Sequence, residues 1–445
     1  MTVVDPIRVR AAIESAGVSV EAIEDATYDV AGMRPSLVAS PGSPEEMAAV
    51  MKIADGSGVA AIPWGGGTRM TVGLPPRRAE LVVKTTGLDE IIEYEPADLT
   101  VTVQAGITLG ALQARLAREG QFLALDPAAA DRATIGGLIA ANASGPLRFM
   151  YGAARDLVIG TRVVNADGII SKAGGRVVKN VAGYDLNKLY IGSLGTVGIV
   201  VELSFKLHPL PQVEGFTVAA FQSLDDAEHA ANTIFRSPLG ASCIELLNAS
   251  AASNVLASSV ADGYVLIVGA GGFEKAVQRQ LREFRAICEK AAEIQDYTDS
   301  TSLGRTWSGL REHSDPSSEG VTLLKMAVPP SRSARALACL ADEASKVGFT
   351  AGVQAHAGTG VAYARILTDG GAAELAGRLA TLLNATRAYA SGEGGSLVVE
   401  ACPAAAREGL DVWGDPGDGF PIMKSLKERL DPNATLNPGR FVRGL

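Results

Sequence analysis

Three consecutive glycines give the first candidate for chemistry in this chain. Gly65, Gly66 and Gly67 follow an apolar run at residues 59–62 and precede Thr68. Glycine has no Cβ, so it accepts positive φ and lets backbone N–H groups approach a ligand closely. Successive N–H groups in such a turn form an anion-binding concavity suited to a diphosphate. The stretch predicts a loop that holds a phosphorylated cofactor, although glycine triplets are more often simply flexible loops.

Two later stretches have a similar character. Residues 125–152 combine small residues with hydroxyl and amide groups, and residues 192–202 place glycines before an apolar run. Small side chains let a backbone lie flush against a flat ring or a diphosphate, while Thr and Asn supply specific hydrogen bonds. The alternatives are a tightly packed Ala- and Gly-rich helix for the first stretch and a β-turn into a core strand for the second.

Helix and strand patterns surround these stretches. Ser43, followed by Pro44 and two glutamates, is typical of a helix start, and residues 59–62 then form a buried strand that leads into the glycines. Alternation at residues 99–104 predicts a strand with one buried face, and Thr108 caps the helix that follows it. From residue 215 to about residue 395, strand and helix patterns alternate, which predicts an α+β sheet domain with helices over one face.

The composition excludes several classes of protein. A chain of 445 residues with 47% hydrophobic and 20% charged residues is globular and long enough for two or three domains. A net charge of -9 without a basic run argues against nucleic acid as the main partner and against a polybasic membrane anchor. The four cysteines have no metal-site spacing, and no apolar window is long enough for a transmembrane segment. We therefore expect a cytoplasmic protein with free thiols.

The order of the three stretches resembles a known family. PWGGGT, then DP...TIGG...NASG...YG, then VKNVAGYDLNKLYIGSLGTVGIV, is similar to the FAD-binding domain of the vanillyl-alcohol oxidase and p-cresol methylhydroxylase flavoproteins. Within that family the resemblance is greatest to the FAD-binding E subunits of bacterial glycolate oxidases. It extends over about residues 35–211, with a looser likeness in a cap domain and in the closing segment LNPGRF. It implies an α+β fold: a two-lobed FAD-binding domain at 1–211, a cap at 212–395, and a segment at 396–445 that returns to the FAD-binding domain.

The resemblance also implies FAD as cofactor. Because Arg69 and Met70 follow Thr68 where some relatives carry a histidine, the FAD is expected to be non-covalent. The implied FAD-binding positions are Pro63, Trp64, Gly65, Gly66, Gly67 and Thr68 at the diphosphate loop; Pro127, Thr134, Gly136, Gly137, Asn142, Ser144, Gly145, Tyr151 and Gly152 along the isoalloxazine and ribityl side; and Gly195 and Ile199, with Ile199 meeting the adenine.

The positions that would act on a substrate are changed. Hydroxy-acid dehydrogenases of this family carry two metal-binding histidines seven positions apart and a later Glu-His pair, whose histidine takes the proton of the substrate hydroxyl. Here His356 and Glu393 match two metal positions, but Tyr363 replaces the second histidine and Gly394 the catalytic one. A catalytic zinc normally needs three protein ligands, so no metal is expected. A general base contributes roughly a hundred- to ten-thousand-fold in rate, and glycine cannot supply it.

A carboxylate-binding residue is less clearly indicated. Arg311 matches an arginine that pairs with the substrate carboxylate in those relatives, and a guanidinium suits a carboxylate. A surface arginine beside Glu312 on a helix is the alternative. Lys179, in the VKNVAGYDL element, could face flavin, substrate or a partner.

These changes favour an FAD-binding subunit of a glycolate oxidase type complex. A sister flavoprotein subunit would oxidise the small hydroxy acid, and an iron–sulfur subunit would take the electrons and could hold the complex at the inner face of the membrane. The first alternative is a stand-alone FAD-dependent D-2-hydroxy-acid dehydrogenase of the D-lactate type, with Tyr363 or Tyr184 as proton acceptor. The second is a scaffold whose flavin is structural or absent.

Overall fold

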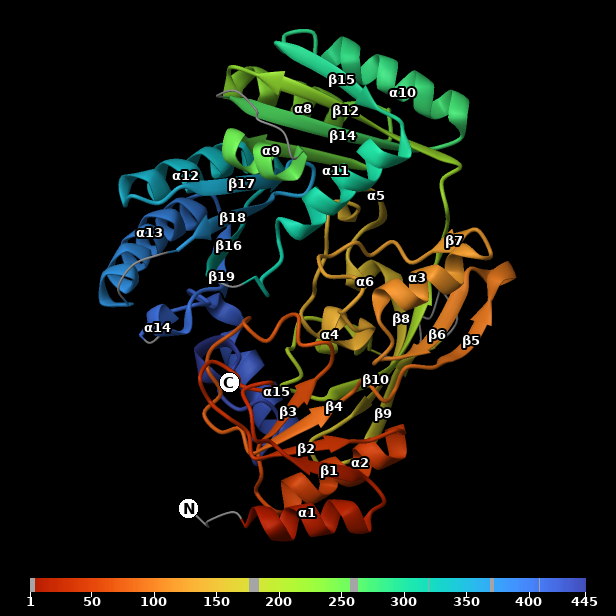
Figure 1. The fold of residues 1–445 in the computed structure, drawn as a ribbon, viewed down its shortest axis with the longest axis vertical. Helices are drawn as coiled ribbons and strands as arrows, with labels where there is room; N and C mark the ends of the chain where they lie inside the picture. Colours follow the sequence, from red (N-terminus) through yellow and green to blue (C-terminus); the bar gives the residue numbers. More distant parts are fainter. Residues whose placement is uncertain (1–4, 176–183, 257–262, 319, 369–371, 408) are drawn as a thin grey trace.

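The chain builds three main sheets, two in its first half and one in its second half (Figure 1). The computed structural model describes residues 5–175, 184–256, 263–318, 320–368, 372–407 and 409–445. The first half forms a four-stranded and a five-stranded sheet, and the second half forms an eight-stranded sheet, the cap sheet. Within the described residues, no helix has both the length and the apolarity to cross a membrane.

The four-stranded sheet positions the glycine loop. Its order is β1-β2-β4-β3, with β2, β4 and β3 parallel and β1 antiparallel to β2. The predicted cap at Ser43 is confirmed, because its hydroxyl accepts the N–H of Glu46 at 3.1 Å and α2 begins at Pro44. The elements are α1 (Pro6–Ser15), β1 (Ser19–Ala22), β2 (Leu37–Ser40), α2 (Pro44–Gly56), β3 (Ala61–Trp64) and β4 (Leu81–Lys84).

The five-stranded sheet is antiparallel, with order β5-β6-β10-β8-β9, and carries the second and third stretches. The predicted cap at Thr108 is confirmed, since its hydroxyl accepts the N–H of Ala111 at 3.2 Å. The strands are β5 (Ile91–Glu95), β6 (Thr100–Gln104), β8 (Val158–Val164), β9 (Ile170–Gly174) and β10 (Ile199–Lys206), beside the small pair β7 (Gln121–Phe122) and β11 (His208–Pro209). The helices are α3 (Leu109–Ala117), α4 (Ile135–Ala140), α5 (Arg148–Tyr151), α6 (Ala154–Leu157) and α7 (Asn187–Tyr190).

The cap sheet is antiparallel throughout, in the order β15-β12-β14-β13-β17-β18-β16-β19. Its strands are β12 (Val213–Phe221), β13 (Cys243–Asn248), β14 (Tyr264–Gly272), β15 (Glu293–Tyr297), β16 (Val321–Ala327), β17 (Ala351–His356), β18 (Val361–Leu367) and β19 (Ser396–Ala401). Its helices are α8 (Leu224–Arg236), α9 (Ala249–Leu256), α10 (Glu274–Ile287), α11 (Ser300–Glu312), α12 (Ser333–Lys346) and α13 (Ala372–Gly392).

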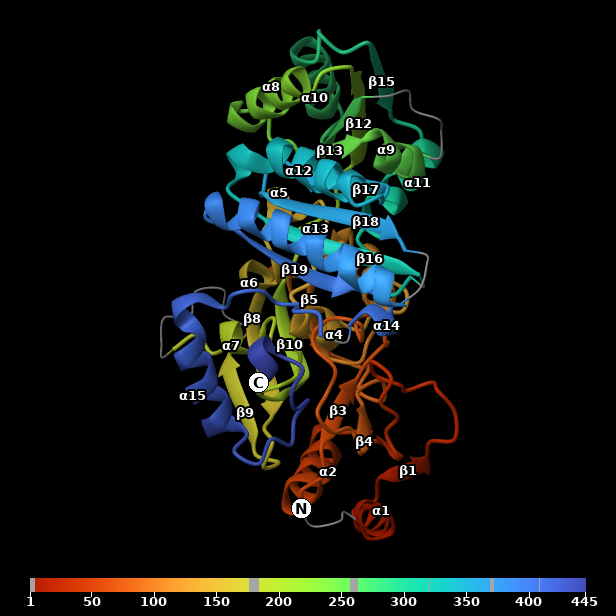
Figure 2. The ribbon, with the colours of Figure 1, turned by 90° about the vertical axis from the view of Figure 1, so that its left-hand side faces the viewer.

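The two faces of the cap sheet differ. One face packs an apolar core against α8, α10, α12 and α13, and the last two lie across the sheet in Figure 2. The prediction that helices cover only one face is wrong, because α9 and α11 pack on the other. The rest of that second face combines a small apolar cluster on β16, β18 and β19 with polar side chains. It lies over the first half of the chain, since side chains from both parts pair across the boundary.

The C-terminal segment begins later than predicted. The boundary at residue 395 falls before β19, which pairs with β16 and so belongs to the cap sheet. After α14 (Ala404–Arg407), the chain leaves the cap, and α15 (Phe420–Leu430) lies among the elements of the FAD-binding domain in Figure 1. Leu436 then bridges to Ala61 in parallel, extending the four-stranded sheet beside β3. The return to the FAD-binding domain therefore starts after Ala401.

A buried histidine should make the cap acid-sensitive. Burial, and secondarily the charge of Arg365, lowers the pKa of His313 to about 4. The unfolded chain takes up a proton below pH about 6.5, whereas the folded chain stays neutral to about pH 4. Stability is therefore complete above pH about 6.5 and falls below it, by roughly 2 kcal/mol at pH 5.

His313→Gln should remove this sensitivity. We expect the difference in unfolding free energy between wild type and variant to shrink by roughly 1–2 kcal/mol from pH 7.5 to pH 5, measured by urea denaturation. The exposed His229→Gln should follow the wild type at both pH values. A difference that did not change with pH would contradict a buried neutral His313.

Candidate cofactor cleft and the polar seam above it

An open cleft lies beside the glycine loop. The walls come from the end of β3, from α4, from the turn before β10 and from the C-terminal segment. The predicted residues in the wall are Pro63, Trp64, Gly65, Gly66, Gly67, Thr68, Thr134, Gly136, Gly137, Gly195 and Ile199.

The glycines of the loop are needed for two different reasons. Gly67 has φ of +71°, a left-handed conformation that suits glycine, as the sequence predicted for the loop. Gly65 and Gly66 do not; they pack flush against residues 132–134. A Cβ on Gly66 would overlap the carbonyl oxygen of Arg132, and one on Gly65 would overlap the hydroxyl of Thr134. The loop and the second stretch therefore fit together as one surface.

The other predicted residues lie outside the wall of this cleft. They continue along the second stretch toward the cap: Tyr151 packs edge-on against His208, with ring centroids 4.8 Å apart. Gly145 lies against the backbone of Asp126, and Asn142 has a left-handed φ of 49°. Contact of these residues with flavin stays a prediction; they are Pro127, Asn142, Ser144, Gly145, Tyr151 and Gly152.

Sequence reasoning missed part of the wall. Asn437 and Arg440 come from the closing segment LNPGRF, which the resemblance marked as related but without a role. Their distance of some 370 residues from the glycine loop hid the contact, because only the fold brings them together. The remaining missed residues adjoin the three stretches: Arg69, Met70, Thr85, Ala140, Ala141, Leu194, Gly198 and Val200.

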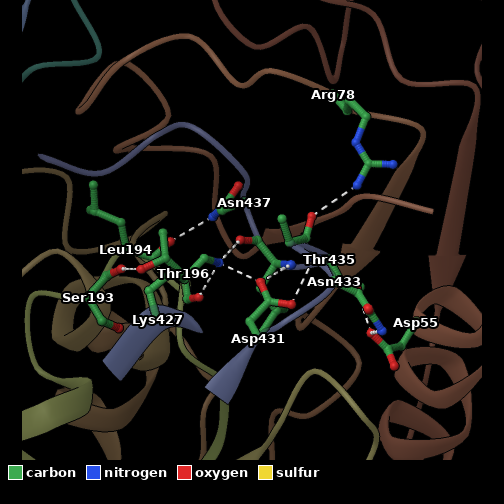
Figure 3. A network of polar contacts seen from close by, with 12 residues as sticks. Asp55, Arg78, Ser193, Leu194, Thr196, Lys427, Asp431, Asn433, Thr435 and Asn437 are labelled. Carbon is green, nitrogen blue, oxygen red and sulfur yellow. Dashed lines mark hydrogen bonds and ion pairs between the residues drawn. The ribbon is translucent and has the colours of Figure 1, made fainter. Parts of the chain in front are cut away.

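A buried ion pair fixes this closing segment (Figure 3). Lys427 Nζ pairs with Asp431 and donates to the carbonyl oxygens of Thr196 at 2.7 Å and Leu436 at 2.8 Å. Asn437 Nδ2 donates to the carbonyl oxygen of Leu194 at 2.6 Å. Leu194 lies in the cleft wall, so the network holds the turn before β10 against the C-terminal segment.

A charged network joins the cleft to the cap sheet. Arg69, in the cleft wall, reaches Glu400 of β19 at 3.4 Å. Lys325 Nζ lies 3.0 Å from the other oxygen of Glu400 and 5.5 Å from the centroid of the Tyr363 ring. Although burial opposes ionisation, Lys325 and Arg69 hold the pKa of Glu400 below its usual value. Burial outweighs Lys325 at Tyr363 and raises the pKa of its phenol, so the hydroxyl stays protonated at neutral pH.

The candidate His356 is buried beside that network. Its Nδ1 lies 2.7 Å from Glu245, which also accepts a hydrogen bond from Gln354 at 2.7 Å. Its ring packs edge-on against Tyr363, with centroids 5.6 Å apart, and its Nε2 has no hydrogen-bond partner within the described residues. Sequence reasoning missed Glu245, because nothing in its neighbourhood on β13 marks it as a partner of His356.

The other two candidates lie apart from His356. Glu393 pairs with Arg332 at 2.9 Å and is partly exposed, so the structure does not bring it to His356. Arg311 stacks on Trp307 and approaches the buried Asp126 at 3.9 Å. Arg311 Nε has no hydrogen-bond partner within the described residues, so this contact is loose, and burial raises the pKa of Asp126 to about 7 despite Arg311.

Two candidates remain, Tyr184 and Lys179. The side chain of Tyr184 is 95% exposed, whereas a proton acceptor for a bound substrate would be buried. Lys179 lies outside the described residues. Within the part of the chain that the structure describes, no three His, Cys, Asp or Glu side chains come together as a metal site.

Comparison with known proteins identifies the family. The family model for the C-terminal domain of FAD linked oxidases matches residues 210–441, and the model of an FAD binding domain matches residues 35–174. The chain belongs to the FAD-linked oxidases. It is 30% identical to "Glycolate oxidase subunit GlcD" of Bacillus subtilis, with 94% of this chain and 91% of that protein covered. It is 28% identical to D-lactate dehydrogenase of Archaeoglobus fulgidus, with 92% of each covered.

Solved structures confirm the fold of this FAD-linked oxidase. p-Cresol methylhydroxylase superposes with a TM-score of 0.75 at 17% identity, covering 98% of this chain and 95% of that one. The 4-ethylphenol oxidase of Gulosibacter chungangensis gives 0.73 at 16% identity, covering 98% and 96%. The predicted α+β architecture of the p-cresol methylhydroxylase type is therefore confirmed. The family models and the relatives in sequence show that the chain is an FAD-dependent oxidoreductase.

The cleft of this FAD-linked oxidase fits the cofactor. Buried polar atoms in its wall have no hydrogen-bond partner within the described residues: Asn437 Oδ1, Arg69 Nε, and Nε and Nη1 of Arg440. Such atoms are costly unless a ligand or water meets them. FAD offers an anionic diphosphate and a ring with both donors and acceptors, which suits this mixture. The four histidines of the chain all lie outside the wall, so we predict non-covalent attachment.

Proposed function

We propose that this chain is an FAD-binding subunit of a glycolate oxidase type complex. Its relatives include the glycolate oxidase subunit of Bacillus subtilis and D-2-hydroxyglutarate dehydrogenase of Xanthomonas citri pv. viticola, which is 28% identical over 92% of this chain. These names support a 2-hydroxy acid as the substrate of the complex, with a sister flavoprotein subunit oxidising glycolate to glyoxylate.

The cluster of Lys325, Tyr363 and Glu400 on the cap sheet is the main observation that supports this proposal. Tyr363 stands where relatives have a second metal-binding histidine, and an ammonium group lies between it and Glu400. The ammonium group of Lys325 already supplies positive charge at this position. A divalent metal would therefore be repelled by that charge, and it would find a protonated phenol in place of a good ligand. The network supports a chain that has lost the metal of its catalytic relatives.

The structure also favours a different residue for the glutamate of the Glu-His pair. Glu393 faces Arg332, whereas Glu400 lies on the polar face of the cap sheet beside Tyr363, at a β-bulge in β19. A bulge re-aims one side chain without ending the strand. We therefore transfer the glutamate position to Glu400, so that Ala401, rather than Gly394, stands where the catalytic histidine would be. Neither residue can take a proton, so the loss of the base is inferred in both cases.

Two of the cations at this boundary between domains are already paired, because Arg69 and Lys325 both lie on Glu400. A substrate carboxylate would have to displace that buried carboxylate to reach them. Arg311 is the exception, because it lies 3.9 Å from Asp126 and its Nε has no hydrogen-bond partner within the described residues. The pairing on Glu400 supports a chain that holds flavin without binding glycolate itself.

The contribution of this chain is then to bind and enclose the flavin. FAD supplies a two-electron acceptor that can pass electrons on singly. The glycine loop, α4 and the C-terminal segment would hold it. The buried side chains of Tyr363, Glu400 and His356, on the side of the cap sheet, would exclude water from one side. The four cysteines are free and dispersed in sequence, so we propose that a separate iron–sulfur subunit receives the electrons.

A dye-coupled assay tests this proposal. The isolated chain, loaded with FAD, should reduce a dye acceptor with glycolate or D-lactate at a rate at least a hundredfold below that of a catalytic relative, because a general base contributes about 10²–10⁴. The same preparation should transfer electrons when the flavin is first reduced chemically. Turnover at an ordinary enzymatic rate would overturn the proposal.

The alternative is a stand-alone D-2-hydroxy-acid dehydrogenase. It is favoured by full-length similarity to D-lactate dehydrogenase, which covers 92% of both chains. Zinc analysis of the purified protein separates the two. We expect less than about one zinc per ten chains, since His356 and Glu400 give only two suitable ligands of the usual three. About one zinc per chain, removable by chelator with loss of dye reduction, would favour the dehydrogenase.

A further inference from the structure

Two buried arginines grip the segment that follows the glycine loop. The carbonyl oxygens of residues 70–73 all accept hydrogen bonds from these arginines. Arg440 Nη2 donates to Met70 at 2.9 Å and to Val72 at 2.5 Å. Arg407 donates to Thr71 at 2.5 Å and to Gly73 at 3.2 Å. Arg440 is 3% exposed and Arg407 is 5% exposed. Carbonyl oxygens satisfy donors but do not neutralise charge, so the positive charges remain.

These two charges have no acidic partner among the described residues, in contrast to Arg69 and Lys325, which both pair with Glu400. Burial, and then the charge of Arg407, lowers the pKa of Arg440 to about 10, so the guanidinium stays charged at neutral pH. Burying a charge without a counter-charge is costly. A pair of like charges in one interior region therefore indicates that an anion belongs beside them.

Arg440 also has donors left over on the cleft side. Its Nε and Nη1 are buried and have no hydrogen-bond partner within the described residues, and Arg440 is part of the cleft wall. Nε and Nη1 lie at different corners of the guanidinium, so each can donate a separate hydrogen bond to an acceptor in the cleft. The same side chain thus fixes residues 70–73 with Nη2 and leaves two donors free for a ligand.

We infer that Arg440 is a direct FAD-binding residue, whose free Nε–H and Nη1–H donors meet an anionic acceptor group of the cofactor, and that Arg407 positions it. The acceptor can be the diphosphate, which is always anionic, or the N1–C2=O edge of the isoalloxazine, which gains negative charge on reduction. The inference concerns the cofactor alone and does not depend on the substrate or partner proposed above.

Arg440→Gln tests the contact by FAD binding and by redox potential, neither of which requires turnover. Apoprotein titrated with FAD should bind at least tenfold more weakly than wild type, and the rise in melting temperature on adding FAD should shrink accordingly. Arg429→Gln, at an exposed position of the same segment, is the matched control and should match the wild type in both. Arg440→Gln that folds and binds FAD within twofold of wild type, at an unchanged potential, would overturn the inference.

Two measurements distinguish the acceptors. If Arg440 meets the diphosphate, Arg440→Gln should weaken ADP binding by the same factor as FAD binding. If it meets the N1–C2=O edge, ADP binding should stay unchanged, while reduced FAD loses at least tenfold more affinity than oxidised FAD. That tenfold difference is a midpoint potential about 30 mV more negative.

Arg440→Lys decides the case if Arg440→Gln does not fold. Lysine keeps the charge but has a single nitrogen, which cannot both bind residues 70–73 and replace the two free donors, so we expect a folded protein with FAD affinity reduced about three- to tenfold. FAD affinity equal to that of wild type in Arg440→Lys would show that these donors make no contact with the cofactor and would overturn the inference.

Discussion

Gly66→Ala should give a folded protein that purifies largely without flavin. The added Cβ would overlap the carbonyl oxygen of Arg132, which is backbone and cannot rotate away. Relief requires the glycine loop to separate from the second stretch, and overpacking of this kind costs about 1–3 kcal/mol. Because the displaced loop forms the cleft wall, we expect FAD affinity to fall about 10- to 100-fold, measured by fluorescence titration of the apoprotein.

Gly56→Ala is the matched control for that substitution. Gly56 ends α2, its φ is not in the left-handed region, and a Cβ there would meet no atom within 4 Å. Alanine in a helix is favoured over glycine by roughly 0.5–1 kcal/mol, so stability should rise slightly and FAD affinity should not change. FAD affinity within twofold of wild type in Gly66→Ala would contradict the close packing of the loop on residues 132–134.

Lys427→Met should strongly destabilise the FAD-binding domain. The substitution removes the ion pair with Asp431, whose side chain is 0% exposed, and two hydrogen bonds to carbonyl oxygens (Figure 3). Removing one partner of a buried pair typically costs about 3–5 kcal/mol, because the other charge stays buried and uncompensated. We expect the unfolding free energy, measured by urea denaturation, to fall by that amount and FAD affinity to fall with it.

A double variant distinguishes the cost of the unpaired Asp431 carboxylate from the cost of the packing lost at Lys427. Asp431→Asn added to Lys427→Met removes the uncompensated carboxylate and should recover at least about 1 kcal/mol. Lys424→Met is the surface control: its ion pair with Glu428, at 3.7 Å, is exposed, so it should cost less than about 0.5 kcal/mol. A loss in Lys427→Met as small as that in Lys424→Met would contradict the role of the network.

Local signals in the sequence predicted the elements well. The caps at Ser43 and Thr108 act within one helical turn, and the apolar runs at β3, β4 and β6 fill the core where they stand. The strand β19 was missed because residues 396–401 were read with the closing segment. Its membership of the cap sheet depends on pairing with β16, more than 70 residues earlier, which no local pattern encodes.

Part of the cleft wall was predicted from the motifs, and its contact with FAD stays a prediction. The predicted positions of the glycine loop all line the cleft, whereas only three of the nine in the second stretch do. Arg440 and Glu400 were missed because their contacts are with residues far away in sequence, Met70 and Lys325. We propose Glu400 in place of the predicted Glu393, because only the folded structure shows that Glu400 pairs with Lys325 and that Glu393 pairs with Arg332.

An anaerobic visible spectrum of the isolated chain separates a flavin-holding subunit from a dehydrogenase. The purified protein, loaded with FAD, would be recorded before and after addition of glycolate or D-lactate, and dithionite would then show that the flavin can be reduced. We predict that the flavin bands persist with either acid and disappear only with dithionite, since neither Gly394 nor Ala401 can accept the substrate proton. Bleaching within seconds of adding either acid would mean that this chain oxidises the substrate itself.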